Sequence, residues 1–135
     1  MEFNLENKRE EIINYLYQYD LLNKTEITIE DEEVLEIFNH IIEEINDIDD
    51  VIVNTLFNYT IERLSFVDRA IIRLATYELK YTEIPAAIII NEAIEITKKI
   101  SDLDDGKQHK FTNKLLDNIN KNVRGWFNWV LRNTQ

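Results

Sequence analysis

The sequence IPAAIIINEAIEITKKI spans residues 84–100 and is apolar on nearly every side for its first ten positions. Three consecutive isoleucines would suit a buried strand, but helically spaced apolar positions continue for longer than most strands do. Pro85 suits the first turn of a helix, where its missing N–H is not needed. A helix that is apolar on all sides is usually buried. We therefore predict that residues 85–100 form the central and most buried helix of the fold.

The composition restricts the fold class. The chain has 135 residues, two glycines, one proline and no cysteine. So few turn residues argue against β-hairpins, and the lack of thiols excludes disulfides and thiolate metal sites. No apolar run is long enough to span a membrane, and residues 1–11 are polar and acidic, unlike a signal peptide. We expect residues 1–135 to form one cytoplasmic, all-α domain without membrane association.

Apolar residues at helical spacing predict a compact bundle of about seven helices. The expected helices cover residues 5–22, 28–45, about 50–61, 65–79, 85–100 and 107–120, and Gly125 is expected to break the chain before a short segment at 126–131. Thr28 and Ser65 are expected to cap the helices that follow them, and Asp47 and Asp50 to cap the third.

The sequence offers little support for an enzyme. There is no glycine-rich phosphate loop, nucleophile elbow or zinc-protease motif. His40 has three glutamates within one helical turn, but two-metal sites in bundles use a Glu-x-x-His motif that does not occur here. We expect His40 to be an exposed histidine among surface acids. We also expect no catalytic residue, no metal and no cofactor.

Three stretches of the sequence, taken in order and spacing, resemble the NusB family of transcription antitermination factors. They are LSFVDRAIIRLATYEL at residues 64–79, INEAIEI at 90–96 and HKFTNKLLD at 109–117, with Pro85 between the first two. The family has an LDRA-to-YEL segment, a proline, an INEA segment and a KFxN segment in this order. A weaker similarity lies in Arg9-Glu10 and in YLYQYD at residues 15–20. The resemblance covers about residues 64–119.

The resemblance to the NusB family implies a seven-helix, all-α fold and a role without catalysis. Members of the family bind the boxA element of nascent ribosomal RNA transcripts. They do so together with NusE, a protein of the small ribosomal subunit, and help the transcription elongation complex to resist termination. We therefore expect boxA-type RNA, NusE and the elongation complex as partners. Some members form homodimers, so a second copy of this chain is a further candidate partner.

The resemblance also implies site residues. RNA-binding residues are expected at Lys8, Arg9, Tyr17, Lys107, Lys110, Phe111 and Asn113, and a NusE-binding acid at Asp68. Aromatic rings can stack on unpaired bases, and cations and amides can contact phosphates and base edges. Each has a plainer interpretation as well. Tyr17 and Phe111 also fit core positions, Asp68 also completes a capping box with Ser65, and the cations also suit an ordinary surface.

The charge distribution leaves a second function open. The formal net charge is −11, residues 26–50 hold eleven acids and no Lys or Arg, and residues 107–135 hold six cations and one acid. The family's first helix opens with a cluster of arginines, where this chain has Leu5, Glu6 and Asn7 before Lys8 and Arg9. The alternative is a protein-only interaction module, or a homodimer, on the NusB fold with weakened or lost RNA binding.

The C-terminal segment 124–135 is an apolar extension that contains Trp126, Phe127 and Trp129. Exposed apolar patches of this size usually mark an interface. We favour packing of this segment against the protein's own helices. The alternatives are a dimer contact and a cover over the groove where RNA or a partner would bind.

Overall fold

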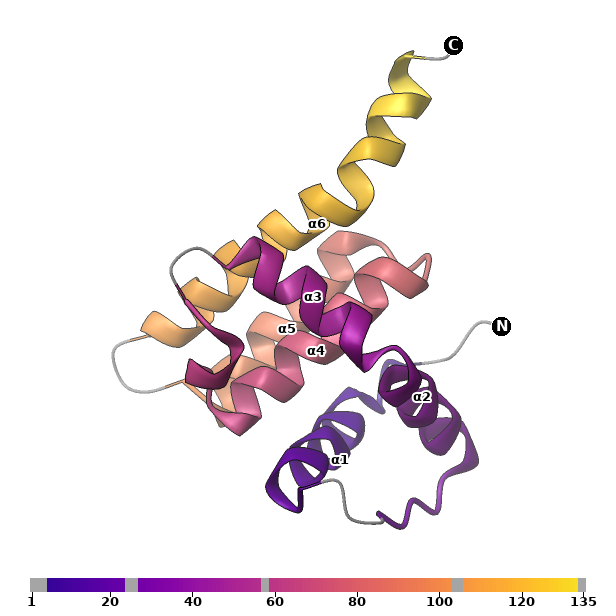
Figure 1. The fold of residues 1–135 in the computed structure, drawn as a ribbon, viewed down its shortest axis with the longest axis vertical. Coiled ribbons are helices and arrows are strands. Elements are labelled where there is room, and N and C mark those ends of the chain that lie inside the picture. The colour runs from indigo at the N-terminus through magenta and orange to yellow at the C-terminus, as the bar shows by residue number, and fades with distance from the viewer. Residues whose placement is uncertain (1–4, 24–26, 57–58, 103–105, 134–135) are drawn as a thin grey trace.

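A computed structural model describes residues 5–23, 27–56, 59–102 and 106–133, with side chains as far as Gly125 (Figure 1). The described residues form six α-helices and one 3₁₀ helix, and contain no strand. The elements are α1 (Arg9–Leu21), α2 (Glu32–Glu43), α3 (Ile45–Thr55), η1 (Ile61–Arg63), α4 (Phe66–Tyr81), α5 (Ala86–Ile100) and α6 (Lys107–Asn133). The predicted all-α bundle of about seven helices is confirmed. No helix in the described ranges is long and apolar enough to cross a membrane.

Helix α4, and not α5, is the central element. It packs against α1, α3, α5 and α6, and every residue from Ala70 to Leu79 is buried. Helix α5 buries Ile89, Ala93, Ile96 and Thr97, whereas Ile88 is 49% exposed. The prediction that residues 85–100 form the most buried helix is therefore wrong. Helix α5 packs mainly against α4 and α6, so its outer isoleucines remain in contact with solvent.

The sequence conceals the burial of α4 because three of its buried side chains, those of Asp68, Arg73 and Glu78, are charged. Glu78 accepts hydrogen bonds from Arg9 of α1, with Arg9 Nη2 2.6 Å from Glu78 Oε1. Arg73 binds Asp20 of α1 at 2.9 Å and Asp49 of α3 at 2.8 Å. A buried charge is tolerated only when it is paired and hydrogen-bonded. These ion pairs therefore fix α1 and α3 against α4.

The helix starts follow the capping predictions only in part. Ser65 caps α4 as predicted, accepting a hydrogen bond from the Asp68 N–H at 3.1 Å. At α2 the cap is Asp31, which accepts from the Val34 N–H at 3.1 Å, so the prediction of Thr28 is wrong. Both residue types can cap a helix, and Thr28 lies three residues too early.

Helix α3 begins without a side-chain cap. It starts at Ile45, directly after Glu44, which is both the C-cap of α2 and the N-cap of α3. The Ile48 N–H bonds to the Glu44 carbonyl at 2.9 Å, so the helical hydrogen bonding starts immediately after the bend. The prediction that Asp47 and Asp50 cap this helix is wrong. Helix α3 also ends at Thr55, and Ile61 belongs to η1.

Helix α6 continues through Gly125, so the predicted break there is wrong. The guanidinium of Arg124 donates to the carbonyls of Glu78, Leu79, Thr82 and Ile84, at 2.8 to 3.2 Å. One glycine costs an exposed helix only about 1 kcal/mol relative to alanine, which is too little to end it. Figure 1 shows the last turns of α6 extending away from the other helices. Side chains from residue 126 onward lie outside the described residues, so the three roles considered for segment 124–135 stay predictions.

Candidate nucleic-acid interface

The two cations expected at the start of α1 are both engaged with acids. Lys8 Nζ lies 3.1 Å from Asp31 Oδ2 and 3.3 Å from Glu33 Oε2. These hydrogen bonds raise the pKa of Lys8, with Asp31 contributing most. Arg9 is buried in its pair with Glu78. Burial raises the pKa of Glu78, and the hydrogen bonds and charge of Arg9 oppose this rise. A phosphate contact at Arg9 would leave a buried carboxylate unpaired, so the structure argues against that assignment.

Asp68 is buried and its carboxylate is used within the fold. Its Oδ2 accepts from the Ser65 hydroxyl at 2.8 Å, and its Oδ1 accepts from the hydroxyl of Ser101. Ser65 lies at the start of α4 and Ser101 follows the end of α5. Asp68 therefore fastens these two helix ends together, and this position limits its access to a partner protein.

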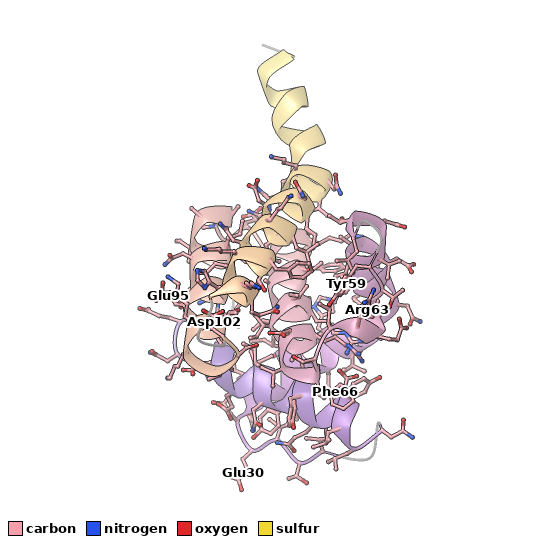
Figure 2. The ribbon with its side chains drawn as sticks, turned by 90° about the vertical axis from the view of Figure 1, so that its left-hand side faces the viewer. Glu30, Tyr59, Arg63, Phe66, Glu95 and Asp102 are labelled. Carbon is pink, nitrogen blue, oxygen red and sulfur yellow. The ribbon has the colours of Figure 1, made fainter. Side chains whose placement is uncertain are left out.

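A contrasting surface lies around the first turns of α6. At about 100° per residue, Lys107, Phe111, Lys114 and Asn118 share one face of this helix. The half-buried ring of Phe111 contacts that of Tyr59, with centroids 5.5 Å apart and planes tilted by 46°. Arg63 lies over the ring of Tyr59, at 5.0 Å from its centroid. Figure 2 shows Tyr59 and Arg63 beside each other on one face of the molecule.

These aromatic rings border an open hollow of about 290 Å³. Thr55, Leu56 and Tyr59 line it from the end of α3 and the segment after it, and Phe111, Lys114, Leu115 and Asn118 line it from α6. Most of the wall is therefore apolar, with one ammonium group and one amide among the lining side chains.

Tyr17 belongs to a second aromatic group at the start of α4. Its ring meets that of Phe66 edge-on at 6.4 Å. Phe66 is 39% exposed, and the Arg69 guanidinium lies 5.3 Å from its centroid. Phe66 appears in Figure 2 on the same face as Tyr59 and Arg63. A strand of nucleic acid could therefore reach both aromatic groups from one side.

The structure separates Asn113 from Phe111. Both lie on α6, and Asn113 is exposed. Two residues apart on a helix point roughly 160° away from each other, so one base cannot stack on Phe111 and meet Asn113 as well. Lys107 and Lys110 are exposed on the same turns. The structure therefore brings Phe111 together with cations, but not with the amide that the motif suggested.

The charges around Phe111 differ from those on the rest of the protein. Lys or Arg side chains at eight described positions have an acid within 4 Å: Lys8, Arg9, Arg69, Arg73, Lys80, Lys98, Lys99 and Lys121. Arg63, Lys110 and Lys114 are exposed, and within the described ranges no salt bridge involves them. In a chain of net charge −11, these three cations lie within four residues of Tyr59 or Phe111 along the chain, whereas Arg124, which also lacks an acid within 4 Å among the described residues, is bound by main-chain carbonyls.

Sequence reasoning found Phe111 and Lys110 but missed Tyr59, Arg63, Lys114 and Asn118. Lys114 lies within the matched stretch at 109–117 and places a second cation one helical turn after Lys110. Tyr59 and Arg63 lie outside the three matched stretches, and only the packing of η1 against the end of α3 brings them near α6. The only sequence feature near them that points to a contact is the spacing of four residues between the tyrosine and the arginine.

His40 is not simply exposed among acids, so that prediction is wrong. Its Nδ1 lies 2.8 Å from the hydroxyl of Tyr77, and its ring meets that of Tyr77 edge-on. Burial raises the pKa of Tyr77 to about 12, which keeps this hydroxyl protonated. Among the residues with described positions, no three His, Cys, Asp or Glu side chains are grouped to hold a metal ion.

Comparisons with known proteins agree on one family. The sequence model of the NusB family matches residues 1–121. The chain is 38% identical to the transcription antitermination protein NusB of Aliarcobacter butzleri, over 84% of this chain and 94% of that protein. It is 37% identical to NusB of Nitratiruptor sp., over 86% and 91%. The structure resembles that of T. maritima NusB with a TM-score of 0.74 and 30% identity, covering 90% of this chain and 93% of that one.

Proposed function

The chain belongs to the NusB family of transcription antitermination factors, and from this premise we propose that it binds boxA-type RNA together with the ribosomal protein NusE. In this role it joins the elongation complex in the cytoplasm and helps it to pass termination signals. The protein contributes binding and positioning, and no chemical step is required of it. The resemblance of residues 109–117 to the family's KFxN segment supports the choice of RNA.

The observation that carries the proposal is the unpaired positive charge beside half-buried aromatic rings. Proteins bind single-stranded RNA by stacking bases on aromatic side chains and by neutralising phosphates with Lys and Arg. Phe111 and Tyr59 supply the rings, and Lys110, Lys114 and Arg63 supply the charges. Tyr17, paired with Phe66, extends this surface toward α1. Lys107 lies on the same face of α6 and adds a further cation near the bound RNA.

The remaining expected residues take indirect roles. Arg9 holds α1 against α4, and Lys8 holds α1 against the start of α2. Asn113 lies on another side of α6, away from the ring of Phe111. Asp68 joins the start of α4 to the end of α5 through its hydrogen bonds with Ser65 and Ser101. It therefore affects NusE binding indirectly, by positioning the residues around these two helix ends.

The overall charge explains why a partner is needed. A net charge of −11 repels a polyanion, and at physiological salt this repulsion acts within a Debye length of about 8 to 10 Å of the surface. Three uncompensated cations give a small local attraction. We therefore expect weak binding of RNA by the protein alone and stronger binding in the complex with NusE.

The test is a pair of charge-removing variants measured with and without NusE. Lys110→Gln with Lys114→Gln removes two exposed cations near Phe111. Lys98→Gln with Lys99→Gln removes two exposed cations of α5 that pair with Glu95 and Glu10. The first variant should lower the slope of log affinity against log salt by roughly 1.4, at about 0.7 for each phosphate on a single strand. The second should leave the slope unchanged, and an equal effect of both would contradict the proposal.

A second function has one specific observation in its favour. The cations at the start of α1 are occupied by acids, as expected of a protein-only interaction module or homodimer on this fold. In this alternative the protein binds NusE or a second copy of itself, and RNA does not change the affinity of that binding. Binding of NusE with equal affinity in the presence and absence of boxA-type RNA would favour it.

A further inference from the structure

We propose that the hollow between the end of α3 and α6 is a pocket for a single unstacked base of the bound RNA strand. This inference rests on the proposed RNA-binding function and adds to it a place where sequence is read. The hollow has a volume of about 290 Å³, at the lower limit of pockets that hold small ligands. It therefore suits one base and not a larger group.

The walls of the hollow suit the faces of a base. The rings of Tyr59 and Phe111 form one side, in a tilted contact at 5.5 Å, and Leu56 and Leu115 add aliphatic surface. Arg63 lies over the Tyr59 ring at 5.0 Å and holds it in place. Stacking of a base on an aromatic ring is favourable for every base, because each base has a π-face. The walls thus supply affinity without choosing among bases.

Asn118 supplies the group that can choose. Among the described residues, no hydrogen bond or ion pair occupies its amide, and its side chain lines the hollow. The other short polar side chain, Thr55, is already satisfied, since it donates to the Val51 carbonyl at 2.8 Å and accepts from Asn122 at 3.0 Å. A carboxamide offers both a donor and an acceptor to a base edge. Asn118 is therefore the residue that we expect to discriminate among the bases.

The charge at the rim identifies the occupant as a nucleotide. Lys114 lines the hollow and Arg63 flanks Tyr59, and neither has an acidic partner among the described residues. An apolar peptide side chain would fill the same volume but would leave these two cations without a counter-charge. A nucleotide combines an apolar face, a polar edge and an adjacent phosphate, which matches the wall, Asn118 and the rim in that order.

The test couples one residue of the hollow to one position of the RNA. The full-length protein, in complex with NusE, is titrated with a boxA-type RNA and with versions that lack a single base at each position in turn. For the unaltered protein, one position should cost at least fivefold in affinity when its base is missing. In Asn118→Trp, which fills the hollow, the same missing base should cost less than twofold. Asn118→Ala repeats the measurement in case the larger residue disturbs folding.

Matched controls separate this inference from the proposed function. Asn91→Ala changes an exposed asparagine on α5 and should keep the full penalty of the missing base. An unchanged penalty in both Asn118 variants, with normal binding of intact RNA, would overturn the pocket and leave the proposed function standing. If the unaltered complex binds neither boxA-type RNA nor oligouridine, both the pocket and the proposed function are overturned.

Discussion

Two pairs of cations in this protein differ in whether the fold leaves them exposed and unpaired. Lys8 and Arg9 open α1, and Lys110 and Lys114 lie on the first turns of α6. Arg9 is buried against Glu78 and Lys8 is held by Asp31 and Glu33, whereas Lys110 and Lys114 are exposed without an acidic partner in the described ranges. A cation is available to RNA only where the fold leaves it unpaired. The comparison indicates that RNA affinity depends more on α6 than on α1.

The largest expected effect is the loss of the buried pair at α1. Arg9→Met removes the guanidinium and leaves the Glu78 carboxylate buried without its partner. Such a loss typically costs about 3 to 5 kcal/mol in the free energy of unfolding. Urea denaturation measures it, with Lys99→Met as a control that removes only an exposed cation. A loss below about 1 kcal/mol for Arg9→Met would mean that Arg9 is available to other partners.

The next effect concerns the aromatic residues of the two regions. Phe111→Leu keeps an apolar side chain but removes the π-face on which a base can stack. The RNA complex should weaken by about 1 to 3 kcal/mol, the usual contribution of one stacked base. Tyr17→Leu should have a smaller effect, because the cations at the start of α1 are already paired with acids and do not add a phosphate contact beside its ring. Fluorescence anisotropy with NusE present compares the two, and the reverse order would place the main RNA contact at α1.

A finer comparison uses one cation from each region. Lys114→Gln should lower the salt slope of RNA binding by about 0.7, the value for one phosphate contact on a single strand. Lys8→Gln should leave the slope as it is, since Asp31 and Glu33 already neutralise Lys8. The measurement is a titration at four or five salt concentrations. Equal slopes for both variants would remove the distinction between the two regions.

The smallest expected effect is on the acid side of the pH–stability curve. The Val34 N–H and Lys8 both favour the carboxylate of Asp31 and lower its pKa below 3.8. Because the folded pKa is depressed, this contribution to stability is present above pH 4 and is lost as the pH falls through the folded pKa. Asp31→Asn should therefore melt at a temperature that depends less on pH below 4. Asp50→Asn, at an exposed position, should retain the steeper dependence of the unaltered protein.

The sequence predicts what depends on neighbours along the chain. Ser65 caps α4 because its partner, the Asp68 N–H, is three residues away. The relative burial of α4 and α5 was not predictable in this way. Arg9 and Glu78 pair although they are 69 positions apart in the sequence. Because this pairing cannot be inferred from the sequence, α4, which has charged residues, is predicted to be less buried than the isoleucine-rich α5.

The same distinction applies to the candidate site. Phe111 was found because it lies within a short stretch that resembles the family. Tyr59 and Arg63 were missed because their closeness to α6 depends on the packing of α3 and η1. The depleted basic cluster at the N-terminus was visible in the sequence. That Lys8 and Arg9 are bound by acids from α2 and α4 was visible only in the structure.

The position of Arg124 has a consequence for where the folding unit ends. The NusB family model stops at residue 121, yet four main-chain carbonyls at the end of α4 and in the segment after it accept hydrogen bonds from Arg124. A protein shortened to residue 121 would leave these carbonyls to water at the junction that orients α5. The smallest fragment of this chain that keeps these hydrogen bonds therefore ends after Arg124. Two pieces divided after residue 121 would reassemble less well than two pieces divided after Gly125.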